Sequence, residues 1–103
     1  MIHVSTTCPD LDAARMLASS ALEARLAACA NITPGLISLF HWQGAIEEEQ
    51  EVLLTLKTRA DLRQPLTRML EADHPYDLPV ITWEDVGSTS DAAAWLSEET
   101  GGD

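Results

Sequence analysis

Basic residues, cysteines and long apolar runs are all scarce in this sequence. Six lysines and arginines stand against seventeen aspartates and glutamates, which gives a formal net charge of −11. A surface of that sign repels phosphate groups, so we expect neither nucleic acid nor a membrane as a partner. Two cysteines are too few for a disulfide framework. No apolar run approaches the ~20 residues that a bilayer-spanning helix needs.

The N-terminal residues carry no basic segment followed by an apolar stretch, so we expect no secretory signal peptide. The expected location is the reducing cytoplasm, where the two thiols would stay free. A hydrophobic content of 46% supports one packed core, and no linker divides the chain. We therefore predict a single domain over residues 1–99. Residues 100–103 have nothing apolar to bury and are expected to form a flexible tail.

Hydrophobic periodicity predicts alternating strands and helices. The first half of the chain is predicted to form a strand over 2–7, a helix opened by Pro9 and Asp10 that ends between 25 and 28, and strands over 29–42 and 45–58. A second helix follows, which starts at Asp61 or after a broken first turn and ends near 72. The chain then forms a strand over 80–86 and a last helix capped by Ser90 and Asp91. This β-α-β-β-α-β order with an extra C-terminal helix is the split βαβ pattern. The predicted fold is therefore an α+β, ferredoxin-like sandwich.

The two long strands raise the question of assembly. A straight strand over 29–42 would run roughly 45 Å at ~3.3 Å per residue, whereas a 100-residue domain has a radius of gyration of about 13 Å. The hairpin therefore either bends at Pro34 and Gly35 or overhangs its own domain. An overhanging hairpin exposes strand edges and the rings of Phe40 and Trp42, so we expect a closed homo-oligomer. The residues do not decide between two and three subunits.

Four stretches of the chain resemble the CutA divalent-cation tolerance family. They are Arg25–Gly35, Trp42–Glu47 continued by Glu51–Leu54 and Lys57–Thr58, His74–Pro79, and Asp91–Leu96. The resemblance runs from Val4 to about Glu99. It implies a ferredoxin-like fold, a homotrimer with inter-subunit strand pairing, and binding of copper or another divalent metal. It also implies that Trp42 and Tyr76 lie near clefts between subunits, to which Asn31 and Lys57 would contribute polar groups.

Cys8 and His74 are the first candidates for metal ligands. A thiolate and an imidazole suit copper or zinc and do not suit magnesium or calcium. Asp73 stands where some members of the family carry a second histidine, and it offers a harder oxygen ligand. The structural alternatives are that Cys8 is a small buried hydrophobe and that His74 is a cation at a helix C-terminus. We expect no metal to be required for folding.

The acidic residues of the second long strand have two interpretations as well. Glu47, Glu49 and Glu51 face the same way on a strand and would attract hard cations weakly. The preferred interpretation is that they keep an exposed sheet edge soluble or meet basic residues of another subunit.

Two functions remain open at this point. One is a non-catalytic trimer that binds a divalent metal; the other is a small-ligand-binding signalling or adaptor trimer with a site between subunits, as in the trimeric nitrogen-regulatory proteins. An enzyme is not expected, because no nucleophile stands at convincing spacing from a base. Arg15 and Asn31 match the residue types of acylphosphatases, but Asp10 places an acid where the phosphate would sit.

Overall fold

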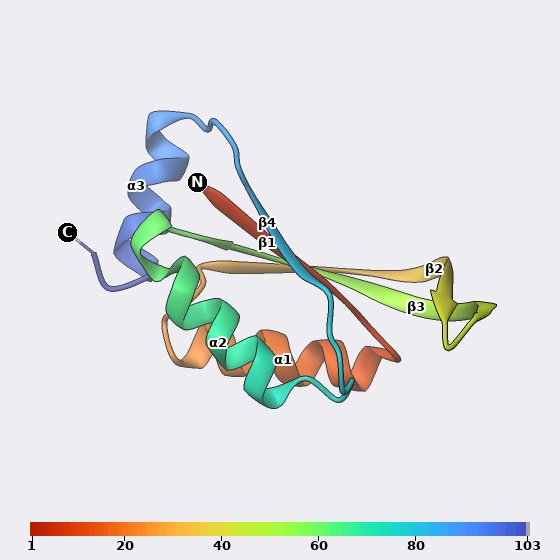
Figure 1. Cartoon of the computed structure of the whole chain (residues 1–103). Helices are drawn as coiled ribbons and strands as arrows, with labels where there is room; N and C mark the ends of the chain where they lie inside the picture. The colour runs from red at the N-terminus through yellow and green to blue at the C-terminus, as the bar shows by residue number, and fades with distance from the viewer. Residues whose placement is uncertain (103) are drawn as a thin grey trace.

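The computed structural model describes residues 1–102 and shows a four-stranded antiparallel sheet with helices α1 and α2 on one face (Figure 1). The elements are β1 (Ile2–Cys8), α1 (Leu11–Glu23), β2 (Cys29–Trp42), β3 (Ala45–Thr58), a 3₁₀ turn (Ala60–Leu62), α2 (Arg63–Asp73), β4 (Ile81–Asp85) and α3 (Ser90–Glu99). The strand order across the sheet is β2-β3-β1-β4. The predicted α+β class and the predicted order of elements are confirmed. No helix among the described residues has the length and apolar character to cross a membrane.

The core lies between the sheet and the helices α1 and α2. Alternate side chains of β1 and β3 point toward the helices, as the two-residue period of a strand requires. The fully buried large side chains include Val4, Leu54 and Leu56 from the sheet, Leu17 from α1, and Leu66 and Leu70 from α2. The opposite face, which α1 and α2 do not cover, carries hydroxyl groups, among them Ser5 and Thr55, whose side-chain oxygens lie 3.1 Å apart.

Helix α1 begins as predicted and ends earlier than predicted. Its N-cap is Asp10, whose carboxylate accepts a 2.8 Å hydrogen bond from the Ala13 N–H. The helix was expected to run to residues 25–28, but it stops at Glu23. Arg25 adopts a left-handed φ of 58°, and the Leu26 N–H turns back to the Ala21 carbonyl at 3.0 Å. This is a Schellman ending, built here on an arginine in place of the usual glycine.

The second helix agrees with one of its two predicted starts, whereas the third differs from the prediction. The second has a broken start, because the 3₁₀ turn comes first and Pro65 then occupies the first turn of α2, where its missing N–H is not needed. The prediction that Ser90 and Asp91 cap the last helix is wrong. The cap is Thr89, whose hydroxyl oxygen accepts from the Ala92 N–H at 3.4 Å.

The β2–β3 hairpin both bulges and overhangs. The pairing register shifts between Thr33 and Leu36, where Gly35 takes a φ of +80°. The tip of the hairpin extends past helices α1 and α2 (Figure 1). The molecule therefore measures 48 × 24 × 21 Å along its principal axes. Large apolar side chains on the overhang are exposed: Ile37, Leu39, Phe40, Trp42 and Ile46. The overhang therefore shows surface that a single copy of the chain does not cover.

Residues 99 and 100 lie against the connection between α1 and β2 and against Arg59, which precedes the 3₁₀ turn. Thr100 is buried, and its hydroxyl donates to the Leu96 carbonyl at 2.7 Å. Its own carbonyl accepts from Arg59 at 3.1 Å, and Arg25 pairs with Glu99 at 2.9 Å. The flexibility expected for residues 100–103 stays a prediction, and Asp103 lies outside the described residues.

Candidate functional site

The end of β1, the segment after α2 and the base of the hairpin meet at one place. His74 ends α2 as its C-cap, and its backbone N–H donates to the Leu70 carbonyl at 2.9 Å. The imidazole is buried. Its Nε2 lies 3.0 Å from the Thr7 carbonyl oxygen and 3.1 Å from the Thr6 hydroxyl. The helix end thus fixes a histidine side chain against the last residues of the first strand.

The hydrogen bonds of His74 define its protonation state. The backbone N–H of Tyr76, which can only donate, lies 3.2 Å from Nδ1. Nδ1 therefore carries a lone pair, and Nε2 carries the proton that it donates to Thr7. Burial lowers the pKa of His74, although the Thr7 hydrogen bond and the charge of Glu51 act in the opposite direction. The ring is thus held as a neutral imidazole.

Tyr76 continues the network to the hairpin. Its hydroxyl donates a 2.7 Å hydrogen bond to Oε2 of Glu51, and its ring lies 5.0 Å from the His74 ring, centroid to centroid. Burial raises the pKa of Glu51, but hydrogen bonds from Ser38, Tyr76 and Thr7 outweigh that effect and leave the pKa below its ordinary value. The pKa of the Tyr76 hydroxyl is raised, first by burial and then by Glu51. We call Thr7, His74, Tyr76 and Glu51 the clasp.

Cys8 lies in the core beside the clasp and is fully buried. Burial, followed by the negative charges of Glu51 and Asp10, raises the pKa of its thiol to about 11. The thiol is therefore protonated at neutral pH, whereas metals bind the thiolate. Asp73 is exposed at the end of α2.

The proposed metal ligands do not form a ready metal site in the folded subunit. Cys8 is protonated, and both ring nitrogens of His74 are engaged by Thr7 and Tyr76. Within residues 1–102, no three or more His, Cys, Asp or Glu side chains gather in a way that would hold a metal ion. With the thiol protonated and both ring nitrogens bonded, these residues do not fit copper or another divalent metal. The predicted ligand set of Cys8, His74 and Asp73 stays a prediction that this geometry does not support.

A groove of about 1000 Å³ lies between the overhanging hairpin and the segment from Pro75 to Val80. Three clasp residues line its inner end: Thr7, Tyr76 and Glu51. Aromatic rings and carboxylates line the rest, chiefly Phe40, His41, Trp42, Glu47 and Glu49. Its composition suits a ligand that combines an apolar surface with positive charge.

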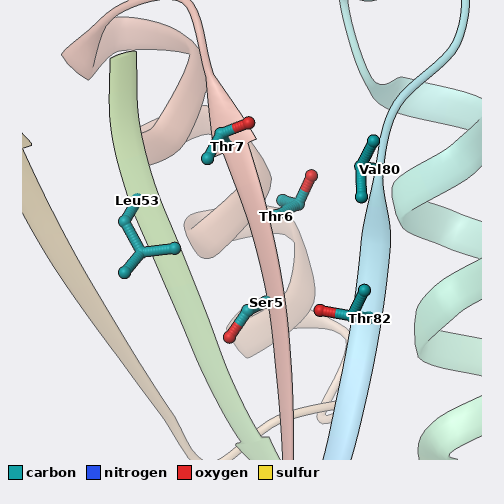
Figure 2. Close-up of a pocket in the computed structure, with 6 residues that line it drawn as sticks. All are labelled: Ser5, Thr6, Thr7, Leu53, Val80 and Thr82. Atoms are coloured by element: carbon teal, nitrogen blue, oxygen red, sulfur yellow. The ribbon is translucent and has the colours of Figure 1, made fainter. Parts of the chain in front are cut away.

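A smaller hollow of about 110 Å³ adjoins the groove on the face of the sheet opposite α1 and α2. Figure 2 shows side chains from three strands around it: Ser5, Thr6 and Thr7 from β1, Leu53 from β3, and Thr82 with the preceding Val80 from the β4 side. Thr7 and Val80 line both cavities, so the groove continues onto this face. The sheet face opposite α1 and α2 is therefore hollowed as well as polar.

The structure brings together two of the four residues expected at clefts between subunits. Trp42 and Tyr76 both line the groove. Asn31 and Lys57 lie elsewhere on the sheet, where Asn31 pairs with Thr55 and Lys57 pairs with His3. Neither Asn31 nor Lys57 lines the groove or the smaller hollow. Their placement at an interface stays a prediction.

Sequence reasoning missed the roles of Glu51, Thr6 and Thr7 at this site. Glu51 was grouped with the other acidic residues as an exposed edge, but it is buried and bonded to Tyr76. Thr6 and Thr7 were not singled out at all. The available signal was the boundary at Glu51, where the acidic half of the strand changes to an apolar run.

Comparisons with known proteins agree with the resemblance seen in the sequence. The model of a family described as CutA1 divalent ion tolerance protein matches residues 2–99. The chain is 40% identical over 99 residues to the divalent-cation tolerance protein CutA of Thermus thermophilus, which covers 95% of this chain and 96% of that protein. It is 40% identical over 100 residues to the chloroplastic protein CutA of Arabidopsis thaliana, where it spans only 55% of the plant protein. The crystal structure of CutA1 from Pyrococcus horikoshii superposes with a TM-score of 0.92 at 41% identity, covering 96% of this chain and 97% of that one.

Proposed function

Because the chain belongs to the CutA1 divalent ion tolerance protein family, we propose that it is a non-catalytic protein that assembles as a homotrimer and contributes to tolerance of copper or a similar divalent metal. The match to the family over residues 2–99 carries this proposal. Location in the cytoplasm is part of it, and a fluorescent fusion found in another compartment would contradict that part.

Titration of the purified, reduced protein tests the metal role. Cu(I), Cu(II) and Zn(II) are added in a calorimeter in the presence of a competing chelator. Stoichiometric binding that survives competition supports the proposal. Binding too weak to compete with the chelator would contradict direct metal binding and leave only an indirect role in tolerance.

The two free edges of the sheet support the trimer. In the order β2-β3-β1-β4, β2 and β4 each have one unpaired edge. A closed trimer needs head-to-tail interfaces, which join two different surfaces, whereas pairing of β2 with β2 would give a two-fold dimer. We infer that the overhang of β2 pairs with β4 of the next subunit. This pairing would extend the sheet of each subunit with a strand from its neighbour.

Exposed apolar residues on the overhang give the test of assembly. Ile37 and Leu39 are 60% and 65% exposed. The double variant Ile37→Ser with Leu39→Ser should be a monomer by light scattering with unchanged secondary structure, whereas the natural chain should be a trimer. Met16→Ser, an exposed apolar residue on α1, is the matched control and should stay a trimer. A monomeric natural chain, or a trimeric double variant, would contradict the proposed interface.

The alternative function is that of a small-ligand-binding adaptor. The groove of about 1000 Å³ favours it, because this volume suits a small molecule and aromatic rings line it. A thermal-shift screen of small metabolites tests this alternative. A stabilising ligand whose effect is lost in Trp42→Ala supports it, and a screen without any stabiliser counts against it.

A further inference from the structure

The clasp accounts for every lone pair and proton of the His74 ring. A metal ion binds imidazole through an unprotonated nitrogen whose lone pair is free. At Nδ1 the lone pair accepts from the Tyr76 N–H at 3.2 Å, and at Nε2 the proton points to the Thr7 carbonyl at 3.0 Å. A metal at either nitrogen would therefore break a hydrogen bond to a backbone group and leave that group unpaired.

The clasp also lies where the hairpin leaves the domain. Glu51 is paired with Leu36, the first residue of β2 beyond the bulge. On β3, residues 45–50 are all exposed, whereas Glu51 and Val52 are buried. The hydrogen bond from Tyr76 to Glu51 thus joins the domain body to the base of the overhang.

We propose that His74 is a positioning residue and not a metal ligand: it holds Tyr76 against Glu51 and so fixes the direction of the overhanging hairpin and the inner end of the groove. The chain of contacts runs from the Thr7 carbonyl through both His74 nitrogens to the Tyr76 backbone, and from the Tyr76 hydroxyl to Glu51. The inference does not depend on whether the protein binds metal at some other place.

Two conservative variants of His74 test the hydrogen bonds at Nδ1 and Nε2 separately. Asparagine places a side-chain oxygen near the position of Nδ1, and so retains the acceptor for Tyr76. Glutamine reaches the position of Nε2 and retains the donor to Thr7. If the clasp positions the hairpin, His74→Asn should preserve hydrogen-exchange protection in residues 36–51. His74→Gln and His74→Ala should exchange about tenfold faster there, as expected for one lost hydrogen bond to a buried partner. Equal exchange in all three variants would overturn the positioning role.

Metal titration of the same variants tests the other half of the proposal. His74→Gln should bind Zn(II) and Cu(II) as tightly as the natural chain, whether that binding is strong or absent. His41→Ala, which removes an exposed imidazole from the hairpin, is the matched control. Loss of metal affinity by about tenfold or more in His74→Gln, with none in His41→Ala, would show that His74 is a ligand after all.

Nitrogen NMR measures the protonation of the His74 ring in the natural chain, so its result does not depend on whether a variant folds. The His74 ring should show a protonated Nε2 and an unprotonated Nδ1, and an equivalent of Zn(II) should leave both signals in place. The opposite tautomer would overturn the clasp, and a shift of the ring signals on adding Zn(II) would overturn the exclusion of metal. Failure of the proposed metal function alone would appear as absent binding with the hairpin result unchanged.

Discussion

The Tyr76 hydroxyl donates a 2.7 Å hydrogen bond to Oε2 of Glu51, a residue only 8% exposed. The two residues come from the segment after α2 and from β3, so this bond joins parts of the chain that are 25 residues apart. It supplies a hydrogen bond that a buried carboxylate needs in order to stay ionised. The bond therefore stabilises the buried carboxylate and also links the segment after α2 to the hairpin.

Removing that hydroxyl should destabilise the protein. We expect Tyr76→Phe to lower the free energy of unfolding by about 1–3 kcal/mol, because Glu51 would lose a partner while staying buried. Urea unfolding measures the change. Glu51→Gln and the double variant complete a cycle in which the two effects should not add. Additive effects would show that the two side chains are not energetically coupled.

Stability should fall in acid, in two steps. Burial keeps the pKa of His74 below the ordinary histidine value of 6.5, so its contribution to stability is complete above pH 6.5 and is lost as the pH falls below that value. The pKa of Glu51 lies below 4.5, so its contribution is lost at lower pH still. In both cases the unfolded chain binds more protons than the folded chain in the affected range, and stability therefore rises with pH.

Urea midpoints measured from about pH 8 down to about pH 2 check this dependence. The step that begins near neutral pH should be missing in His74→Gln, and the more acidic step should shrink in Glu51→Gln. A natural chain whose midpoint stays constant or rises as the pH is lowered would contradict both assignments.

The two cysteines should differ sharply in reactivity. Cys8 is fully buried with its pKa raised to about 11, whereas Cys29 at the start of β2 is partly exposed. Iodoacetamide at neutral pH should alkylate Cys29 first and reach Cys8 only after unfolding, since reaction requires an accessible thiolate. Peptide mass spectrometry distinguishes the sites. Alkylation of Cys8 at the rate of Cys29 would mean that the core around β1 opens readily.

Gly35 should be needed for its backbone conformation alone. It has a φ of +80°, and nothing lies within 4 Å of the Cβ that an alanine would add. Gly35→Ala should therefore cost about 1 kcal/mol through backbone strain. Gly87→Ala is the matched control, because Gly87 is equally open and has no positive φ. Equal changes in unfolding free energy for the two variants would contradict the argument from strain.

Periodicity was enough to predict the order of strands and helices, because each element buries one face and repeats at its own period. Helix ends were less predictable. Arg25 takes a left-handed conformation that glycine usually adopts, so no residue type in this segment indicated where α1 ends. Before α3, cap-forming residues occur in succession, and local preference does not choose Thr89 over Ser90.

The site was less predictable than the fold for a different reason. Cys8 and His74 were recognised as chemically interesting, but their states depend on long-range neighbours. Thr7 reaches His74 across 67 positions of sequence, and Tyr76 meets Glu51 only through the register of β3. Strand register decides which acidic residue is buried, and composition alone treats Glu49 and Glu51 alike.

The strand order has a consequence for synthesis on the ribosome. β1 is translated first, yet it lies between β3 and β4, which are translated later. Both of its edges therefore stay unpaired until residues 52–58 and then 81–85 have emerged. A premature stop before Ile81 would release a chain whose first strand keeps one open edge, and such a chain is a target for chaperones and proteases.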